Sequence, residues 1–220
     1  MKTRMAIIIW TIGIHLCLSQ GFVNLNFESP ILPLTPVYFE VPIANALPGW
    51  HGYTYDIETG SVYYRDRALD AAAISLHDGV GPYSFQPIRG SYSVLLQGSS
   101  MSGVQGSASL AQTGQIPSDA QALRFAVGGG FCGYYVSFAG QLLPLFQVSS
   151  GTNYVVMAAD ISSYAGQIGE LRFTAMPRGW LFFDSVLFTP TPIPEPCAAA
   201  SLALGTVVLL WRRCKANHPF

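Results

Sequence analysis

The chain has 220 residues, half of them hydrophobic and only a tenth charged, so composition excludes a mainly disordered protein and suggests one folded domain with appendages. Its formal net charge of -1 hides an asymmetry, because all 12 acidic residues lie between Glu28 and Glu195, whereas the basic residues also occupy both chain ends. This acidic middle argues against a nucleic-acid partner, which would need a basic face.

Residues 1–19 are typical of a secretory signal peptide. Lys2 and Arg4 precede an apolar run over residues 5–18, and small residues at Cys17 and Ser19 predict cleavage after Ser19. Two alternatives stay open: an uncleaved anchor, and a lipoprotein signal ending at Cys17. In each case the export machinery is the expected first partner.

Residues 20–188 are predicted to form the folded domain. It starts with an alternating strand at residues 22–28, a proline-rich loop over residues 30–50, and a hairpin at residues 53–64 that breaks at residues 58–60. Further strands are predicted at residues 72–76, 91–97, 108–113, 122–127, 134–138, 141–148, 154–160, 171–175 and 180–188. Because these strands are short and no long helix interrupts them, the predicted fold is all-β, an antiparallel β-sandwich flanked by an N-terminal signal helix and a C-terminal transmembrane helix.

Several motifs could in principle indicate a nucleotide, metal or catalytic site. Residues 128–133 match G-x-G-x-x-G, but strand sequence follows where a dinucleotide site needs a helix, so a glycine-rich hairpin loop is predicted. His51, His77 and His218 have no metal-ligand neighbour at a suitable spacing and are expected at the surface or in loops. Cys132 is the only cysteine of the predicted domain, and a small buried apolar role is expected for it.

Acidic residues also cluster in the sequence around the predicted hairpin. A pair of carboxylates could hydrolyse glycosides, but arginines at positions 65 and 67 are interleaved with the acids, which favours a solvated, salt-bridged loop; the acids are Asp56, Glu58, Asp66 and Asp70.

The C-terminal tail, residues 189–220, has three parts. A proline-rich spacer covers residues 189–196, an apolar segment covers residues 197–211, and a basic end covers residues 212–220. As a helix the apolar segment would measure about 22 Å, slightly short of the roughly 20 residues of a full span. A transmembrane helix is nevertheless predicted, and an ordinary permanent anchor is the simpler alternative.

The tail resembles the PEP-CTERM sorting signal of Gram-negative bacteria. The resemblance is carried by Pro194, Glu195 and Pro196 before the apolar segment, and by Arg212 and Arg213 after it. It implies an exosortase-type membrane protease as partner and delivery to the cell surface or extracellular matrix. The short apolar segment and the extension at residues 216–220 depart from the family pattern.

The domain resembles galactose-binding-like carbohydrate-binding modules in short pieces at residues 24–28, 48–50, 90–94 and 182–188. The resemblance implies that the antiparallel β-sandwich is a jelly roll. This resemblance implies glycan binding by exposed aromatic side chains, for which Trp50, Tyr53 and Tyr55 are the main candidates, with a core position as the alternative. It also implies a structural Ca²⁺ between Glu28 and Asp184, and no other cofactor.

Together these features predict an exported protein whose non-catalytic β-sandwich binds glycan, such as exopolysaccharide, or has a structural role. The alternatives are a surface polysaccharide-active hydrolase and a permanently membrane-anchored surface protein.

Overall fold

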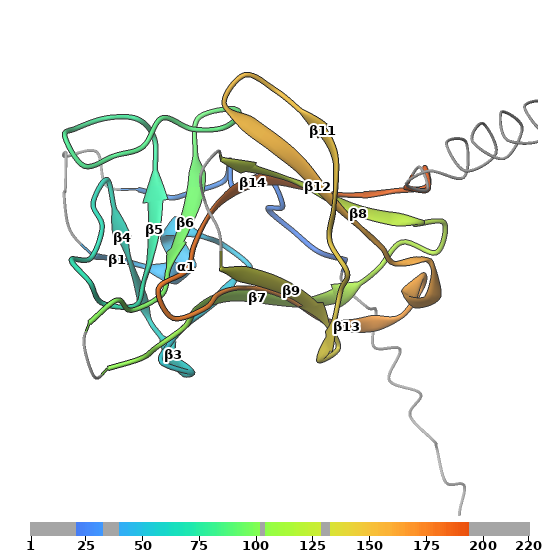
Figure 1. Cartoon of the computed structure of the whole chain (residues 1–220), viewed down its shortest axis with the longest axis horizontal. Helices are drawn as coiled ribbons and strands as arrows, with labels where there is room; N and C mark the ends of the chain where they lie inside the picture. The colour runs from blue at the N-terminus through green and yellow to red at the C-terminus, as the bar shows by residue number, and fades with distance from the viewer. Residues whose placement is uncertain (1–20, 33–39, 102–103, 129–132, 194–220) are drawn as a thin grey trace, which may run out of the picture.

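The computed structural model describes residues 21–32, 40–101, 104–128 and 133–193. They form two packed β-sheets with almost no helix (Figure 1), the helical elements being α1 (Ile43–Ala46) and the 3₁₀ turn η1 (Ser162–Tyr164). None of the helices within these ranges is long and apolar enough to cross a bilayer. The all-β prediction is therefore confirmed, whereas the predicted signal helix and tail helix lie outside the described residues.

The larger sheet has eight strands in the order β1-β4-β5-β6-β14-β8-β12-β11. Their bounds are β1 Glu40–Pro42, β4 Ser61–Tyr64, β5 Ala73–His77, β6 Ser93–Gln97, β14 Trp180–Thr189, β8 Ala122–Gly128, β12 Tyr154–Asp160 and β11 Phe146–Ser150. Strands β4 and β5 run parallel, and the other pairings of this sheet's described strands are antiparallel.

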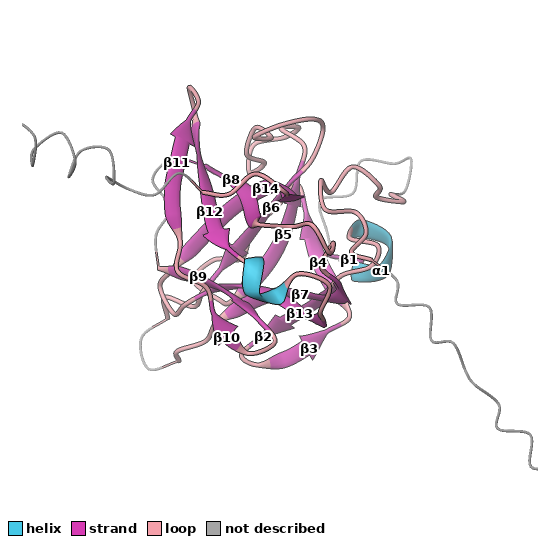
Figure 2. Ribbon diagram, turned by 90° about the vertical axis from the view of Figure 1, so that its right-hand side faces the viewer, coloured by secondary structure: helices cyan, strands magenta, loops and turns pink. Residues whose placement is uncertain are grey.

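The smaller sheet has six strands in the order β10-β9-β13-β7-β2-β3, all paired antiparallel. Their bounds are β10 Gln141–Leu142, β9 Tyr134–Phe138, β13 Ile168–Ala175, β7 Ala108–Gln115, β2 His51–Thr54 and β3 Ile57–Thr59. Figure 2 shows the two sheets as separate layers, with α1 at one end of the sandwich.

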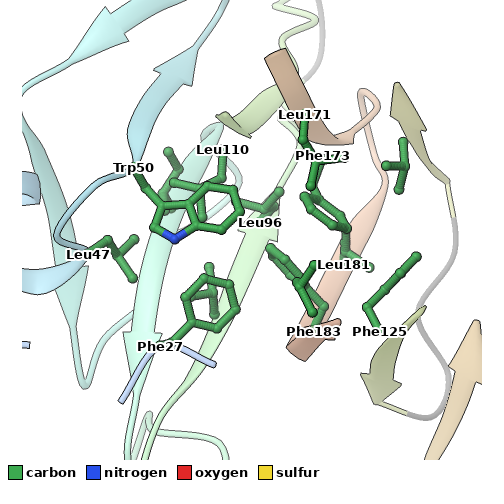
Figure 3. Packing of buried hydrophobic residues seen from close by; sticks show 14 of the residues in the cluster. Phe27, Leu47, Trp50, Leu96, Leu110, Phe125, Leu171, Phe173, Leu181 and Phe183 are labelled. Carbon is green, nitrogen blue, oxygen red and sulfur yellow. The ribbon is translucent and has the colours of Figure 1, made fainter. Parts of the chain in front are cut away.

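The core lies between the sheets. Phe173 of β13 and Phe183 of β14 stack across the interface with ring centroids 4.6 Å apart, and both are fully buried. Leu110, Leu96 and Phe125 add to the same cluster (Figure 3). Alternate residues along each strand face this cluster, so the residues between them face outward.

Most predicted strands are present. Strands β9 and β12 have the predicted bounds, and β5, β6, β7, β8, β13 and β14 differ from their predictions by a few residues at the ends. The predicted segment 141–148 holds two strands, β10 and β11, as expected from Pro144 between them. Local signals, either alternation or a short run of β-forming apolar residues bounded by turn residues, were therefore enough to locate these elements.

The strand predicted at residues 22–28 is wrong. Asn24 and Phe27 have φ angles of 48° and 57°, which break the extended conformation. The side-chain amide of Gln112 accepts from the Val23 N–H at 2.6 Å and donates to the Val23 carbonyl at 3.0 Å, and these two bonds replace a strand ladder. The turn carries Phe27 into the core, where it is fully buried.

Two predicted hairpins also need correction. In the first, the chain reverses at Tyr55 and Asp56, both with positive φ, and Gly60 marks the step of the chain from one sheet to the other. The second was expected around residues 128–133, but β8 belongs to the eight-stranded sheet and β9 to the six-stranded sheet. That connection therefore joins two layers, which pattern analysis of each strand alone does not reveal.

Candidate functional site

The outer face of the eight-stranded sheet is half covered and half open. Over β5 and β6 lie two loops, residues 65–72 and 78–92, which we call the cover. The side chain of Gln97 donates to the carbonyls of Ala68 and Ala71 in the cover, at 3.0 Å and 3.1 Å. Beneath it His77 is fully buried between Phe85 and Phe182. Over β8, β12 and the end of β14 the face is hollowed instead.

The first hollow has a volume of about 530 Å³ and lies where the cover ends. Aromatic side chains and neutral polar groups line it together, namely Phe85, Gln86, Pro87, Ile88, Gly128, Gly151, Thr152, Asn153, Tyr154 and Phe182. This mixture of apolar surface and a few amides and hydroxyls is typical of ligand pockets.

Tyr154 is held in a defined position at this hollow. It starts β12 opposite Gly128 of β8. Arg89 donates from Nη2 to the Tyr154 hydroxyl at 3.0 Å, and its guanidinium carbon lies 5.0 Å from the ring centroid. At Gly151 an added Cβ would come within 2.5 Å of the ring, so the glycine makes room for Tyr154. The ring is thus a preorganised wall.

A second hollow of about 250 Å³ adjoins the first along β8 and β12. It is lined by Arg89, Arg124, Phe125, Ala126, Ser149, Val156, Ser185 and Leu187. The pair Ala126–Val156 is one same-face step from the pair Gly128–Tyr154, about 7 Å at strand rise. We call the two hollows together the outer groove.

Irregular strand pairing shapes the second hollow. The register of β14 against β8 shifts between Asp184 and Leu187, and Ser185 there has a φ of 53°. The register of β11 against β12 shifts between Gln147 and Ser149. Such bulges redirect side chains, and Ser185 and Ser149 both line the hollow.

Two carboxylates hold the loop that delivers Arg89. Asp184 Oδ2 accepts from the Arg89 backbone N–H at 3.0 Å and from Ser93 Oγ at 2.9 Å. Glu28 Oε1 accepts from the backbone N–H groups of Ser91 and Tyr92, at 2.8 Å and 3.0 Å. Burial raises the pKa of Asp184 to about 6, although its hydrogen bonds lower it.

These same two carboxylates were the predicted Ca²⁺ pair. Both contact residues 89–93, each through N–H or hydroxyl donors. Among the described residues no group of three His, Cys, Asp or Glu side chains could hold a metal ion. The calcium site stays a prediction, and the structure gives Glu28 and Asp184 a role in fixing this loop.

Trp50 is not available as a sugar platform. It is 3% exposed and packs 5.6 Å from Phe27 and 6.3 Å from Phe173 between ring centroids (Figure 3). Its Nε1–H donates to the Asn24 carbonyl at 3.1 Å. The core alternative holds for this residue because the turn at residues 24–27 closes over it.

Tyr53 and Tyr55 are partly buried. Tyr53 lines a shallow hollow of about 240 Å³ on the outer face of the six-stranded sheet, under the guanidinium of Arg172 at 4.2 Å. Tyr55 is in the β2–β3 turn, and its hydroxyl accepts from the Ala72 N–H at 3.2 Å. Neither lies in the outer groove.

The acidic cluster predicted near the hairpin is dispersed. Arg65 pairs with Asp78, with Nη2 2.6 Å from Oδ2. Glu58 pairs with His51 at 2.8 Å in the hollow beside Tyr53.

His51 is exposed as predicted, but His77 is buried, because the cover hides β5. His218 and Cys132 lie outside the described residues, as do the predicted sorting residues Pro194, Glu195, Pro196, Arg212 and Arg213.

Sequence reasoning missed Tyr154, Arg89 and Arg124 as site residues. Tyr154 was assigned only as the start of a strand, although Gly151, Thr152 and Asn153 before it form a turn rich in polar groups. The arginines come from a loop and a strand far apart in the sequence, and only the sheet order brings them together.

No family model matches the chain, and no curated protein matches it. Among solved structures it is similar to the enzymatically active domain of tailspike protein 4 of bacteriophage CBA120, with 12% identity, a TM-score of 0.35, and coverage of 64% of this chain and 19% of that chain. It is also similar to a family 11 carbohydrate-binding module from Clostridium thermocellum in complex with a β-1,3-1,4-mixed-linked tetrasaccharide, with 9% identity, a TM-score of 0.35, and coverage of 67% and 92%. At these TM-scores neither likeness carries weight for fold or ligand.

Proposed function

We propose that the β-sandwich is a non-catalytic glycan-binding domain and that the outer groove is its binding site. The observation that carries this proposal is the first hollow, where Tyr154 stands beside the amides of Gln86 and Asn153 and the hydroxyl of Thr152. A sugar presents both apolar C–H faces and hydroxyl edges, and an aromatic ring with neighbouring neutral hydrogen-bonding groups complements both. The jelly-roll class of the sandwich is part of the same proposal.

We also propose that the protein is exported and that residues 189–220 are a PEP-CTERM sorting signal, processed by an exosortase-type membrane protease, that delivers the domain to the cell surface or extracellular matrix. Support comes from the sequence, in the order proline motif, apolar segment and arginines. Cell fractionation followed by intact-mass measurement tests it. Loss of the signal and of the tail helix from the surface form agrees with the proposal, whereas a surface form that keeps residues 197–220 indicates a permanent anchor.

A glycan array tests the binding function. We expect the full-length protein in detergent to bind one group of glycans, and Tyr154→Ala to weaken this binding at least about tenfold, because stacking contacts of one aromatic ring account for an effect of that size. Tyr53→Ala is the matched control, since Tyr53 also lies under an arginine but on the opposite sheet. Absence of binding, or equal loss in both variants, contradicts the proposal.

One observation favours a second candidate, a polysaccharide-active hydrolase. Glu58 and Glu170 line the same hollow as Tyr53. Each is paired with a basic group, Glu58 with His51 and Glu170 with Arg172, both at 2.8 Å. Release of reducing sugar from a polysaccharide panel, abolished by Glu58→Gln or by Glu170→Gln, would establish this alternative in place of binding alone.

A further inference from the structure

The second hollow differs from the first in its charge. Arg89 and Arg124 both line it, and none of its eight lining residues is acidic. Within the described ranges the ion pairs involve other basic residues, namely His51, Arg65 and Arg172. The two arginines of the hollow therefore have no carboxylate partner there, although the domain as a whole is acidic.

Arg124 has unused donor capacity. Its Nε is enclosed and has no hydrogen-bond partner among the described residues. Its Nη2 contacts the Pro192 carbonyl at a long distance of 3.4 Å. The enclosed Nε is out of a ligand's reach, but partial burial of the charged guanidinium costs free energy, and a carboxylate that accepts from its Nη atoms offsets that cost. This makes Arg124 a candidate for binding an anionic group rather than a residue with a purely structural role.

The fold places Arg89 at the same hollow as Arg124. The backbone N–H of Arg89 is bound by Asp184, and its side chain rests on the Tyr154 ring, so one guanidinium connects the two hollows. Ser185 and Ser149 add hydroxyl groups to the walls. Planar guanidinium groups bind carboxylates through two parallel hydrogen bonds, which makes arginine well suited to recognising that group.

We propose that the second hollow is a subsite for the carboxylate of an acidic sugar, so that the glycan recognised by the outer groove is a uronic-acid polysaccharide. This inference rests on the proposed glycan-binding function. Tyr154 packs against the sugar ring in the first hollow, while Arg89 and Arg124 bind the carboxylate of the neighbouring residue one step along the strands.

Binding of uronate polymers and of an esterified, uncharged counterpart tests the subsite. Calorimetric titration of the full-length protein in zwitterionic detergent would compare polygalacturonate and alginate with fully methyl-esterified polygalacturonate, which has the same backbone without the charge. We expect the uronates to bind at least about tenfold more tightly, the difference expected for charge-assisted hydrogen bonds. Arg124→Gln and Arg89→Gln should each remove this preference.

Arg178→Gln is the matched control, because Arg178 is an exposed arginine that lines neither hollow. It removes the same charge and should leave the preference unchanged. Thermal melting of each variant shows whether the fold is intact, and Arg89→Gln gives an independent reading if Arg124→Gln does not fold.

The remaining outcomes separate this inference from the function on which it rests. If the esterified polymer binds as tightly as the acid, and Tyr154→Ala weakens both, the groove binds glycan and the subsite is wrong. If dextran sulfate binds as tightly as the uronates, general charge rather than carboxylate recognition explains the result, which also overturns it. If none of these polymers binds, the uronic-acid subsite is wrong, and the glycan array decides separately whether the glycan-binding function holds.

Discussion

The two outer faces of the sandwich present the same pair of side chains in different surroundings. Tyr53 lies under Arg172 on the six-stranded sheet, and Tyr154 lies under Arg89 on the eight-stranded sheet. Arg172 also binds Glu170 through two hydrogen bonds at 2.8 Å and 3.1 Å, whereas the side chain of Arg89 forms no ion pair with an acidic residue in the described part of the chain. The hollows measure about 240 Å³ and 530 Å³.

This difference shows why residue type alone does not identify a site. An arginine that already donates to a carboxylate has little to offer a ligand, and the pKa of Arg172 is raised chiefly by its hydrogen bonds to Glu170. An arginine over an aromatic ring without such a partner keeps free donors next to an apolar surface. The comparison therefore favours the groove of the eight-stranded sheet as the binding site.

The largest loss of stability is expected when the ion pair that fixes the cover is removed. Asp78 accepts from Arg65 and from the Tyr64 hydroxyl at 2.8 Å, and the side chains of Arg65 and Asp78 are 17% and 10% exposed. We expect Asp78→Ala to lower the free energy of unfolding by about 3 kcal/mol, because it removes the carboxylate that pairs with a largely buried guanidinium. Urea unfolding measures this, and Asp119→Asn, at an exposed position, is the control.

A second large effect depends on pH and involves the covered half of the same face. Burial lowers the pKa of His77 from 6.5 to about 4. Between these values the unfolded chain binds the proton and the folded protein does not, so stability falls as the pH is lowered through this window. We expect a loss of about 2 kcal/mol between pH 7 and pH 5 from this group.

The variant His77→Gln isolates that contribution. The difference in unfolding free energy between pH 7 and pH 5 should be smaller in the variant than in the natural protein by this amount. Asp184 acts with the opposite sign, since its pKa is raised to about 6, but it is present in both proteins. An identical pH dependence in the two proteins would show that the cover does not bury His77 as described.

Removing the ion pair on the outer face of the six-stranded sheet is expected to change stability only slightly. The side chains of Glu170 and Arg172 are 39% and 25% exposed, and ion pairs with this exposure contribute less than about 1 kcal/mol. Glu170→Gln should therefore change the urea midpoint far less than Asp78→Ala. A loss as large as that of Asp78→Ala would contradict the distinction between an exposed pair and a buried one.

The smallest effect is expected from removing metal. Glu28 and Asp184 accept hydrogen bonds from the loop at residues 89–93, so the loop is held without invoking an ion. We expect the melting temperature measured by calorimetry to be the same with and without chelator. A clear decrease with chelator would establish the predicted calcium site instead.

The sequence predicted the parts of the fold that follow from local signals, and it missed the parts that depend on residues far apart in the chain. Strands β9 and β12 were located because runs of β-forming, mostly apolar residues near glycines are local signals. The turn at residues 24–27 was missed because it depends on Gln112, a residue about ninety positions away whose amide binds Val23. The layer change between β8 and β9 likewise depends on partners elsewhere in the chain.

The site was predicted less well than the fold, for a related reason. Trp50 has the right chemistry for sugar binding, but Phe27 and Phe173 enclose it. Tyr154 has the same chemistry and stays accessible because β8 and β12 leave the face beside it open. Exposure and free donors decide between such residues, and both follow from sheet order rather than from local pattern.

The most direct test of the groove is its footprint in hydrogen exchange. Exchange measured by mass spectrometry, with and without an oligosaccharide that the array identifies, reports which backbone segments a ligand protects. The account predicts protection of residues 85–89 and 151–154, around the outer groove, with residues 51–58 unchanged. Protection of residues 51–58 without change at residues 85–89 and 151–154 would place the ligand on the six-stranded sheet and contradict it.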